Sequence, residues 1–418
     1  MSVLHDELSA SEPPAGAHSS KNNFSAQVKK LYQGDSGLIP IMIGLLCLVI
    51  YFEARSSVFL SASNLTSLFI ESTVFILLSM AEIWLLLLGE IDLSLGFVSG
   101  LGGAIAVILV DTQYNWPWYL AVLLALSVTT LIGTVSGLLV IRLRLPSFIV
   151  TLAGLLGYQG VLIFLVDRQG TGGVVPLQNS VLHNLVYGDF TPLATWIFLI
   201  AVIAIMGFSM LRSERRRRAS GLQSRPFWVT VVKIAFLAVA GVLLAIIFNT
   251  NRSTFTTIKG MPFAIPIVMA VLAAGSFILI KTKAGRYVYA IGGNTEAARR
   301  SGVNVDRYRL MAFMLGGLTA GIAGLMYASN LGGISSGIDG GTLVLYAVAA
   351  AVIGGTSLFG GRGKMIHAIV GGTIIATIYN GMALIGMSAA TQYIATALVL
   401  VAAVTIDSVA RRGSTVSR

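Results

Sequence analysis

The segment KTKAGRYVYAIGGNTEAARRSGVNVDRYRL, which runs from Lys281 to Leu310, is densely charged but lies between two long apolar runs. The rest of the chain is poor in charge, because its 418 residues are 56% hydrophobic and 11% charged, with a mean hydropathy of +0.85. Soluble domains usually contain about 25% charged residues, whereas apolar runs near the roughly 20 residues that cross a bilayer recur along this sequence. We therefore interpret the segment as a connection between two spans of an all-α, polytopic membrane protein.

Within this connection, the residues NTEAARRSG favour a short helix. Asn294 or Thr295 can cap its start, because both side chains accept hydrogen bonds from first-turn N–H groups. Glu296 suits the positive end of the helix dipole, Arg299–Arg300 suit the negative end, and Gly302 is typical of a helix stop. We expect an independent helix at the membrane surface rather than a plain solvated connector, since a connector needs neither capped ends nor this length.

Glycine is unusually frequent, at 46 of 418 residues against a usual share of about 7%. Gly292–Gly293 is expected to form a sharp turn that leads into the short helix. Small-residue pairs at helical spacing, such as Gly133 with Gly137 and Gly317 with Gly321, indicate tight helix packing, because small residues let helices approach closely in lipid.

Twelve apolar segments are predicted to cross the membrane, most of them near the roughly 20 residues that a span requires. In chain order they are Leu38–Phe52, Ser67–Leu88, Gly96–Val110, Trp118–Ile141, Ser147–Val166, Pro192–Leu211, Thr230–Phe248, Pro262–Ile280, Arg309–Ala328, Leu343–Phe359, Met365–Ile385 and Gln392–Thr405.

Four consecutive arginines, Arg215–Arg218, indicate which side of the membrane each loop faces. Lys and Arg are enriched in cytoplasmic loops, so we expect the loop Arg212–Val229 to be cytoplasmic and the arginine run to act as an orientation anchor. Counting crossings from this loop puts both termini and the connection Lys281–Arg309 on the same side. The same count puts the loops Asp167–Asp189 and Asn330–Thr342 on the opposite side.

The domain organisation follows from this count. Residues 1–36 are polar and rich in Ser, Ala and Asn, which is typical of a disordered tail. We expect a cytoplasmic tail there, a transmembrane domain over 37–408 that includes the charged connection 281–309, and a second cytoplasmic tail over 409–418. The net charge of +11 does not indicate a nucleic-acid partner, because the basic residues lie mostly in loops beside the spans; the expected surroundings are a lipid bilayer.

GGTSLFGGRGKM, from Gly354 to Met365, is not a phosphate-binding loop. Such a loop requires Gly, four residues and then Gly-Lys-Ser/Thr, but here the first position is Leu358 and the residue after Lys364 is Met365. ATP-driven transport would therefore need another subunit. The four histidines and single cysteine lack metal-ligand spacing, and no nucleophile lies beside a base, so we expect neither a cofactor nor covalent catalysis.

Carboxylates occur at two unusual places. GEIDLSLG, from Gly89 to Gly96, can form an acid–base couple or a cation site; the interpretation that we favour is loop anchoring, with Asp92 or Ser94 capping the next helix. Glu82 lies inside an apolar run, where a carboxylate is costly and hence a functional candidate. It can face an aqueous cavity, pair with a cation, or be protonated.

Four motifs occur in an order that carries a family resemblance. They are GEIDLSLG, LPSFIVTLAG (Leu145–Gly154), AIGGNTEAARRSGVNV (Ala290–Val305) and VIGGTSLFGG (Val352–Gly361). From about Asn64 onward the chain resembles the permease subunits of bacterial ATP-binding-cassette (ABC) importers, in the branch that serves ribose, galactosides and xylose. It is most similar to the xylose type in the residues of the third motif. It also has an additional arginine-rich loop and span, Arg212–Phe248, as that type does. Shorter members of the branch have about ten spans of this length, so we expect 10–12.

The resemblance implies a type II-like ABC importer transmembrane fold in the bacterial inner membrane. It implies a homodimer with a pathway at the dimer interface, two ATP-binding subunits on the cytoplasmic side and a periplasmic sugar-binding protein outside. It also implies a coupling helix that enters a cleft on the ATP-binding subunit, made of Glu296, Ala297, Ala298, Arg299, Arg300, Ser301 and Gly302.

The substrate pathway is less defined by the sequence. Polar residues inside spans can line it, but interhelical hydrogen bonding is the commoner use of such residues. The candidates are Glu82, Thr151, Gln159, Tyr379 and Asn380. Two further functions remain open: a permease for branched-chain amino acids, whose fold is related, and a proton-coupled secondary carrier that uses Glu82.

Overall fold

The computed structural model describes residues 38–221, 227–253, 255–398, 401 and 405. The predicted tails 1–36 and 409–418 lie outside the described residues. So does part of the predicted span Gln392–Thr405, of which residues 392–398 are helical.

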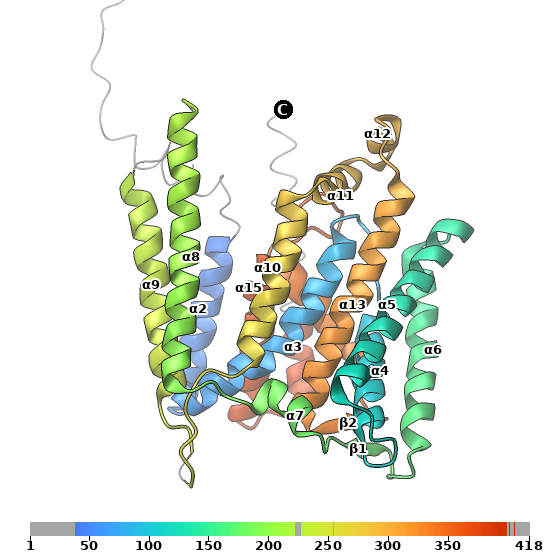
Figure 1. Cartoon of the computed structure of the whole chain (residues 1–418), viewed down its shortest axis with the longest axis horizontal. Helices are drawn as coiled ribbons and strands as arrows, with labels where there is room; N and C mark the ends of the chain where they lie inside the picture. Colours follow the sequence, from blue (N-terminus) through green and yellow to red (C-terminus); the bar gives the residue numbers. More distant parts are fainter. Residues whose placement is uncertain (1–37, 222–226, 254, 399–400, 402–404, 406–418) are drawn as a thin grey trace, which may run out of the picture.

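Long apolar helices run back and forth through one bundle (Figure 1). Every predicted span from Leu38–Phe52 to Met365–Ile385 coincides with one of them, which confirms the all-α, polytopic interpretation. Among the described residues, eight helices are long and apolar enough to cross a membrane, and α4 and α14 are apolar but shorter. The eight are α3 (Ala62–Leu86), α5 (Trp118–Leu143), α6 (Ser147–Asp167), α8 (Pro192–Ala219), α9 (Phe227–Asn249), α10 (Ala264–Lys281), α13 (Val305–Leu331) and α15 (Ile366–Leu384). The other apolar helices of the bundle are α2 (Leu38–Arg55), α4 (Leu95–Val110) and α14 (Gly340–Ile353).

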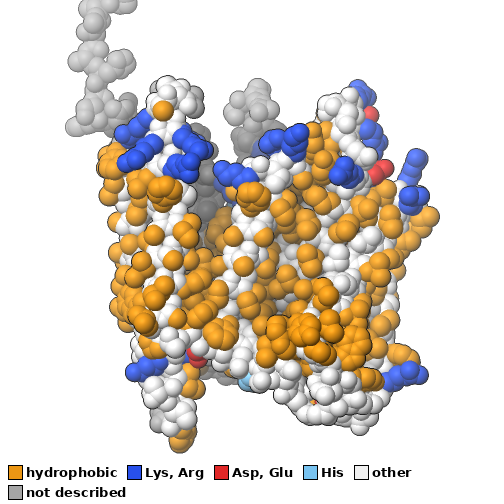
Figure 2. Space-filling view, viewed as in Figure 1, with side chains coloured by type: hydrophobic (Ala, Val, Ile, Leu, Met, Phe, Trp, Pro, Cys, Tyr) orange, Lys and Arg blue, Asp and Glu red, His pale blue; other side chains and the backbone are white. Residues whose placement is uncertain are grey.

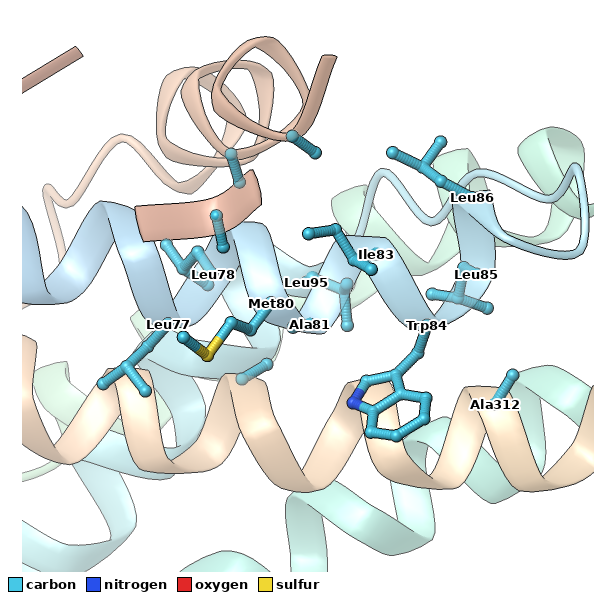
Figure 3. Close-up of a cluster of buried hydrophobic side chains, with 14 of the residues drawn as sticks. Leu77, Leu78, Met80, Ala81, Ile83, Trp84, Leu85, Leu86, Leu95 and Ala312 are labelled. Carbon is cyan, nitrogen blue, oxygen red and sulfur yellow. The ribbon is translucent and has the colours of Figure 1, made fainter. Parts of the chain in front are cut away.

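Helix α3 forms the centre of the bundle. It packs against α13, α14 and α15, and its side chains from Ser72 to Leu86 are buried. In Figure 3, Trp84 and Met80 point toward the helix that carries Ala312, which is α13. Because lipid is as apolar as these side chains, the packing is stabilised by close contact rather than by exclusion of water.

The close approach of α5 and α13 depends on glycine. A Cβ atom on Gly133 would lie 2.2 Å from the carbonyl oxygen of Phe313, and one on Gly317 would lie 2.4 Å from that of Thr129. Real Cβ atoms do not approach other atoms this closely, so only glycine fits at either position. The tight packing predicted for these two glycines is confirmed.

Helices α8 and α9 form a hairpin at one edge of the bundle (Figure 1). Thr191 caps α8, because its Oγ1 accepts a hydrogen bond from the N–H of Ala194 at 3.3 Å. Large apolar side chains such as Leu193 and Phe236 are exposed along the hairpin, as expected of a surface that faces lipid.

The two ends of the bundle differ in charge. Figure 2 shows Lys and Arg gathered where α8, α10 and the connection after α10 reach the surface, with a broad apolar band below them and fewer cations at the opposite end. We name the first the basic end. The basic end also carries α11 (Lys283–Gly293) and α12 (Thr295–Arg300).

At the opposite end, which we name the sheet end, β1 (Val174–Pro176) pairs antiparallel with β2 (Gly333–Ser335). The short helix α7 (Ser180–Tyr187) lies beside them, and the Ser329 hydroxyl donates a hydrogen bond to the His183 carbonyl at 2.9 Å. The loops that were predicted to share the side opposite the arginine run therefore lie together, whereas neither the strands nor α7 was predicted.

Candidate functional site

The short helix predicted in the charged connection is present as α12. Its cap is Asn294, whose Oδ1 accepts a hydrogen bond from the N–H of Ala297 at 2.9 Å. Glu296 pairs with Arg300 at 3.4 Å and with Arg299 at 3.9 Å. Gly302 follows with a φ of +84°, a conformation that glycine adopts without strain. The predicted cap, charge order and stop are confirmed.

The surface of α12 is free to meet another molecule. The side chain of Arg300 is 80% exposed, that of Glu296 62% and that of Arg299 59%. Ala297, Ser301 and Gly302 are also exposed, and Ala298 is the buried residue that seats the helix. Of the seven residues predicted to form a coupling helix, six are exposed and one is buried. The helix itself ends at Arg300, so Ser301 and Gly302 lie in the turn that follows it.

The predicted sharp turn at Gly292–Gly293 is wrong, because both glycines end a further helix, α11. The chain turns one residue later, at Asn294, which has an extended backbone with φ −160° and ψ 99°. The buried residues Gly285, Val288 and Ile291 follow at intervals of three, a spacing that places them on one helix face. That spacing is the sequence signal that could have revealed α11.

Gly292 instead allows three separate segments to meet. A Cβ atom there would lie 1.8 Å from the Leu87 carbonyl oxygen and 2.5 Å from the N–H nitrogen of Gly361. That same N–H donates a hydrogen bond to the Leu87 carbonyl at 2.9 Å, and Gly360 and Gly361 have φ values of +85° and +71°. We name Leu87, Gly292, Gly360 and Gly361 the glycine junction; it joins the end of α3, the end of α11 and the turn before α15.

Two side-chain contacts reinforce the glycine junction. The Tyr289 hydroxyl donates a hydrogen bond to the Gly363 carbonyl at 2.7 Å, and burial raises the pKa of this phenol. Arg309, near the start of α13, pairs with Glu90 at 2.6 Å. The loop after α3 is therefore held to the segments on both sides of α12.

The GEIDLSLG loop is anchored as expected, but its capping prediction is wrong. Asp92 Oδ1 accepts hydrogen bonds from the N–H of Ser94 at 2.9 Å and from the Ser94 hydroxyl at 2.6 Å. Ser94 occupies the cap position of α4 but makes no side-chain cap hydrogen bond, because its hydroxyl is used by Asp92. The two residues bond to each other rather than to the helix.

Removing the cation of the Glu90–Arg309 pair should destabilise the protein. Arg309→Met leaves the Glu90 carboxylate, whose side chain is 9% exposed, without its partner, and an unpaired buried acceptor costs about 1–3 kcal/mol. We expect a lower thermal unfolding midpoint in detergent, partly restored in Glu90→Gln/Arg309→Met. Arg307→Met changes an exposed neighbouring arginine and serves as the control. An Arg309→Met protein as stable as this control would contradict the prediction.

A cavity of about 260 Å³ lies toward the sheet end, where α3, α13, α14 and α15 meet. Its wall combines acidic side chains, Glu71 and Asp339, with aromatic ones, including Phe75, Tyr346 and Tyr379. Phe75 meets the edges of Tyr346 and Tyr379, with ring centroids 5.7 Å and 6.0 Å apart. Such a mixture of apolar faces and a few placed polar groups is typical of small-molecule sites.

Glu71 is the polar centre of this wall. Its carboxylate is hydrogen-bonded to the side chain of Asn380, and its Oε2 is buried without a hydrogen-bond partner among the described residues. A buried acceptor without a partner is unfavourable, so this oxygen is suited to a hydroxyl group that enters the cavity.

The structure brings together only some of the predicted pathway residues. Tyr379 lines the cavity and Asn380 bonds to its wall. Thr151 instead accepts a hydrogen bond from the N–H of Leu93 at 3.1 Å, and Gln159 lies on α6 at the edge of the bundle (Figure 1).

Glu82 is fully buried outside the cavity. The backbone of Asp92 faces its carboxyl group, and Glu82 forms no ion pair within the described part of the chain. Glu71 was missed, although it also lies within the predicted span Ser67–Leu88 and meets the criterion that selected Glu82. No group of three potential metal-binding side chains is found among the described residues.

Comparison with known proteins places the chain in a family. The family model described as "Branched-chain amino acid transport system / permease component" matches residues 64–404. The xylose transport system permease protein XylH of Escherichia coli is 33% identical over 411 residues, which cover 98% of each chain. XylH of Haemophilus influenzae is 33% identical over 370 residues, which are 88% of this chain and 95% of that protein.

The ribose import permease protein RbsC of Haemophilus influenzae is more distant, at 28% identity over 88% of this chain and 91% of its own. No solved structure matches the chain significantly. These relatives confirm the resemblance carried by the four motifs, and eight helices in the described part of the chain are suited to crossing a membrane. The chain therefore belongs to the family of ABC transporter permeases, as a multi-pass protein of the inner membrane.

Proposed function

We propose that the chain is the transmembrane subunit of an ABC importer for a monosaccharide, with xylose as the first candidate. The observation that carries the proposal is the match to the xylose permease of Escherichia coli at 33% identity over 98% of both chains. The family description names branched-chain amino acids, but a wall of aromatic rings and carboxylates suits the hydroxyl groups of a sugar better than an aliphatic side chain.

The basic end is proposed to face the cytoplasm, with both termini on that side, because Lys and Arg are enriched in cytoplasmic loops. The exposed face of α12 would then dock into a separate ATP-binding subunit. Leu358 and Met365 stand where a phosphate-binding loop requires Gly and Ser or Thr, which supports a permease without an ATPase site of its own. Two copies of each subunit, with a pathway between the permeases onto which the cavity of each one opens, and a sugar-binding protein at the sheet end, complete the proposed assembly.

Coupling is proposed to pass through the glycine junction. Movement of α12 is carried by α11 to Leu87 at the end of the central helix α3, and by the Glu90–Arg309 pair to α13. Both helices border the cavity. Rigid movement of these elements would open the cavity alternately to either side of the membrane.

Reconstitution tests the proposed substrate and energy source together. Liposomes that contain the permease, its ATP-binding subunit and the cognate binding protein should take up radiolabelled xylose with ATP, and should not take up leucine. An uncoupler, which removes the proton gradient, should leave uptake unchanged. Uptake by a proton-coupled carrier would stop under the same treatment. Uptake of leucine in place of sugar, or sugar uptake against a gradient without the ATP-binding subunit, would refute the proposal.

Glu71→Gln should weaken sugar recognition. A hydrogen bond to a charged group contributes about 1.5–3 kcal/mol, so losing the carboxylate should raise the KM for uptake about tenfold or more. Glu82→Gln is the matched control, because it makes the same change on the same helix outside the cavity. Equal KM values for the two variants would remove Glu71 from the proposed pathway.

A further inference from the structure

We propose that the basic end of α8 and the end of α10 together bind the headgroup of an anionic phospholipid. A hollow of about 440 Å³ lies between them. Four cations line it, three from α8 and one at the last position of α10: Arg212, Arg216, Arg217 and Lys281. None of the four has a carboxylate partner within 4 Å in the part of the chain that the structure describes. A group of unneutralised cations around a hollow is suited to a phosphate group.

The lining residues follow the period of the helix. The hollow is lined on α8 by the three arginines together with Ser209, Ser213 and Ser220. Each of these six residues has another of the set three or four positions away, so they form one stripe along the helix. The neighbouring arginines do not belong to this stripe: Arg218 pairs with Glu214 at 3.7 Å and lies over the ring of Phe227. The arginine run thus has two faces, and only one of them borders the hollow.

Apolar surface continues directly below the stripe. Ile205 and Met206, which precede Ser209 by four and three residues, are exposed, as are Phe277 and Ile280 on α10. This combination commits the site to a lipid, because a free phosphate or nucleotide would use the cations but not the apolar surface below them. The acyl chains would lie against these side chains while the headgroup occupies the hollow.

The position of the hollow along α8 corresponds to the depth at which lipid headgroups lie in a bilayer. At 1.5 Å per residue, Arg212 lies about 30 Å along α8 from Pro192, which is close to the hydrocarbon thickness of a bilayer, about 30 Å. Anionic lipids are enriched in the cytoplasmic leaflet, where juxtamembrane Lys and Arg attract them. The cations therefore lie at the level of lipid phosphates when α8 spans the membrane.

A bound lipid would complete the attachment of the hairpin. At the sheet end, direct contacts hold α8 and α9 to the bundle: the N–H of Met261 donates to Thr195 Oγ1 at 2.9 Å, and Phe248 packs on Phe69 with ring centroids 5.6 Å apart. At the basic end, the hollow lies between α8 and Lys281. The lipid would bridge this gap beside the residue from which the chain continues into α11.

The test compares lipid retention in two variants of equal charge. Full-length protein purified in detergent is titrated with phosphatidylglycerol, and bound lipid is counted by native mass spectrometry. A Lys or Arg near an anionic surface contributes about fivefold in affinity, so Arg212→Gln/Arg216→Gln should bind about 30-fold more weakly. Arg215→Gln/Arg218→Gln removes the same charge from the same helix outside the hollow, and should bind as the native protein does.

Further measurements secure the interpretation. Lys281→Gln alone, on α10, should weaken binding about fivefold, which tests the site even where the double variant folds poorly. Phosphatidylcholine should not compete, and inorganic phosphate should not displace the bound lipid. Equal losses in the two double variants would show a diffuse charge effect, and displacement by inorganic phosphate would show a general anion site; either result overturns the proposal.

Discussion

Gly292→Ala is expected to abolish transport and to lower the stability of the folded protein. The new Cβ atom would lie 1.8 Å from the Leu87 carbonyl oxygen and 2.5 Å from the Gly361 nitrogen. Both are backbone atoms and cannot rotate away as a side chain would. Overpacking of this kind usually costs about 1–3 kcal/mol and sometimes more, and separation of the segments would also break the hydrogen bond between Gly361 and Leu87, worth about 1 kcal/mol. Together these terms give an expected loss of stability of about 2–4 kcal/mol.

The adjacent glycine provides the control for this prediction. Gly293 also lies in α11, but a Cβ atom there would have no other atom within 4 Å. Gly293→Ala should therefore keep full transport and gain up to about 1 kcal/mol from higher helix propensity. The thermal unfolding midpoint in detergent and ATP-driven uptake in liposomes measure both effects. A Gly292→Ala protein that transports as well as Gly293→Ala would show that α11 need not contact α3.

Local features of the fold could be predicted from the sequence. The cap at Asn294, the charge order of α12 and the limits of the long helices depend on neighbouring residues, which the sequence displays directly. The glycine junction could not be predicted, because Leu87 and Gly292 are about 200 residues apart in the chain and meet only after the helices pack. The sequence indicates that a glycine is needed at position 292, but it does not show that the need comes from close contact with Leu87 and Gly361.

The cavity illustrates the same limit. Glu71 and Glu82 are eleven residues apart on α3, which is about three helical turns, so they lie on similar faces at different depths. Composition alone does not separate them. The packing of α13, α14 and α15 determines which of the two carboxylates reaches the cavity. It leaves space beside Glu71, whereas Glu82 is fully buried. Tyr379 and Asn380, which lie at the cavity, could be selected as candidates from the sequence, since polar residues in an apolar run are rare at any depth.

Exchanging charges on α12 should disconnect the protein from its proposed ATP-binding subunit without unfolding it. In Glu296→Lys/Arg299→Glu the net charge is unchanged. The ion pairs on α12 are exposed, so their loss costs at most about 1 kcal/mol, and the unfavourable order along the helix dipole adds about 0.3–1 kcal/mol for each charge. The cap at Asn294 and the buried Ala298 are untouched. The folded permease should therefore accumulate in the membrane at nearly its normal level.

Binding to the partner should respond far more strongly than folding. Truncating one member of a charge pair buried at an interface costs about 2–5 kcal/mol, and here two charges would meet groups of their own sign. We expect co-purification of the ATP-binding subunit and ATP-driven uptake to fall more than about 30-fold, since 2 kcal/mol already corresponds to that factor.

A matched pair of single variants separates position from charge. Arg300→Glu on α12 should weaken the complex, whereas Arg142→Glu should not. Arg142 is an exposed arginine in the last turn of α5, a helix that ends at the same end of the bundle (Figure 1). If the double variant retains a stoichiometric ATP-binding subunit, α12 is not the docking helix. The exposed cations of α11, Lys283 and Arg286, would then be the next residues to exchange, because they are the other charged surface that the glycine junction holds against α3.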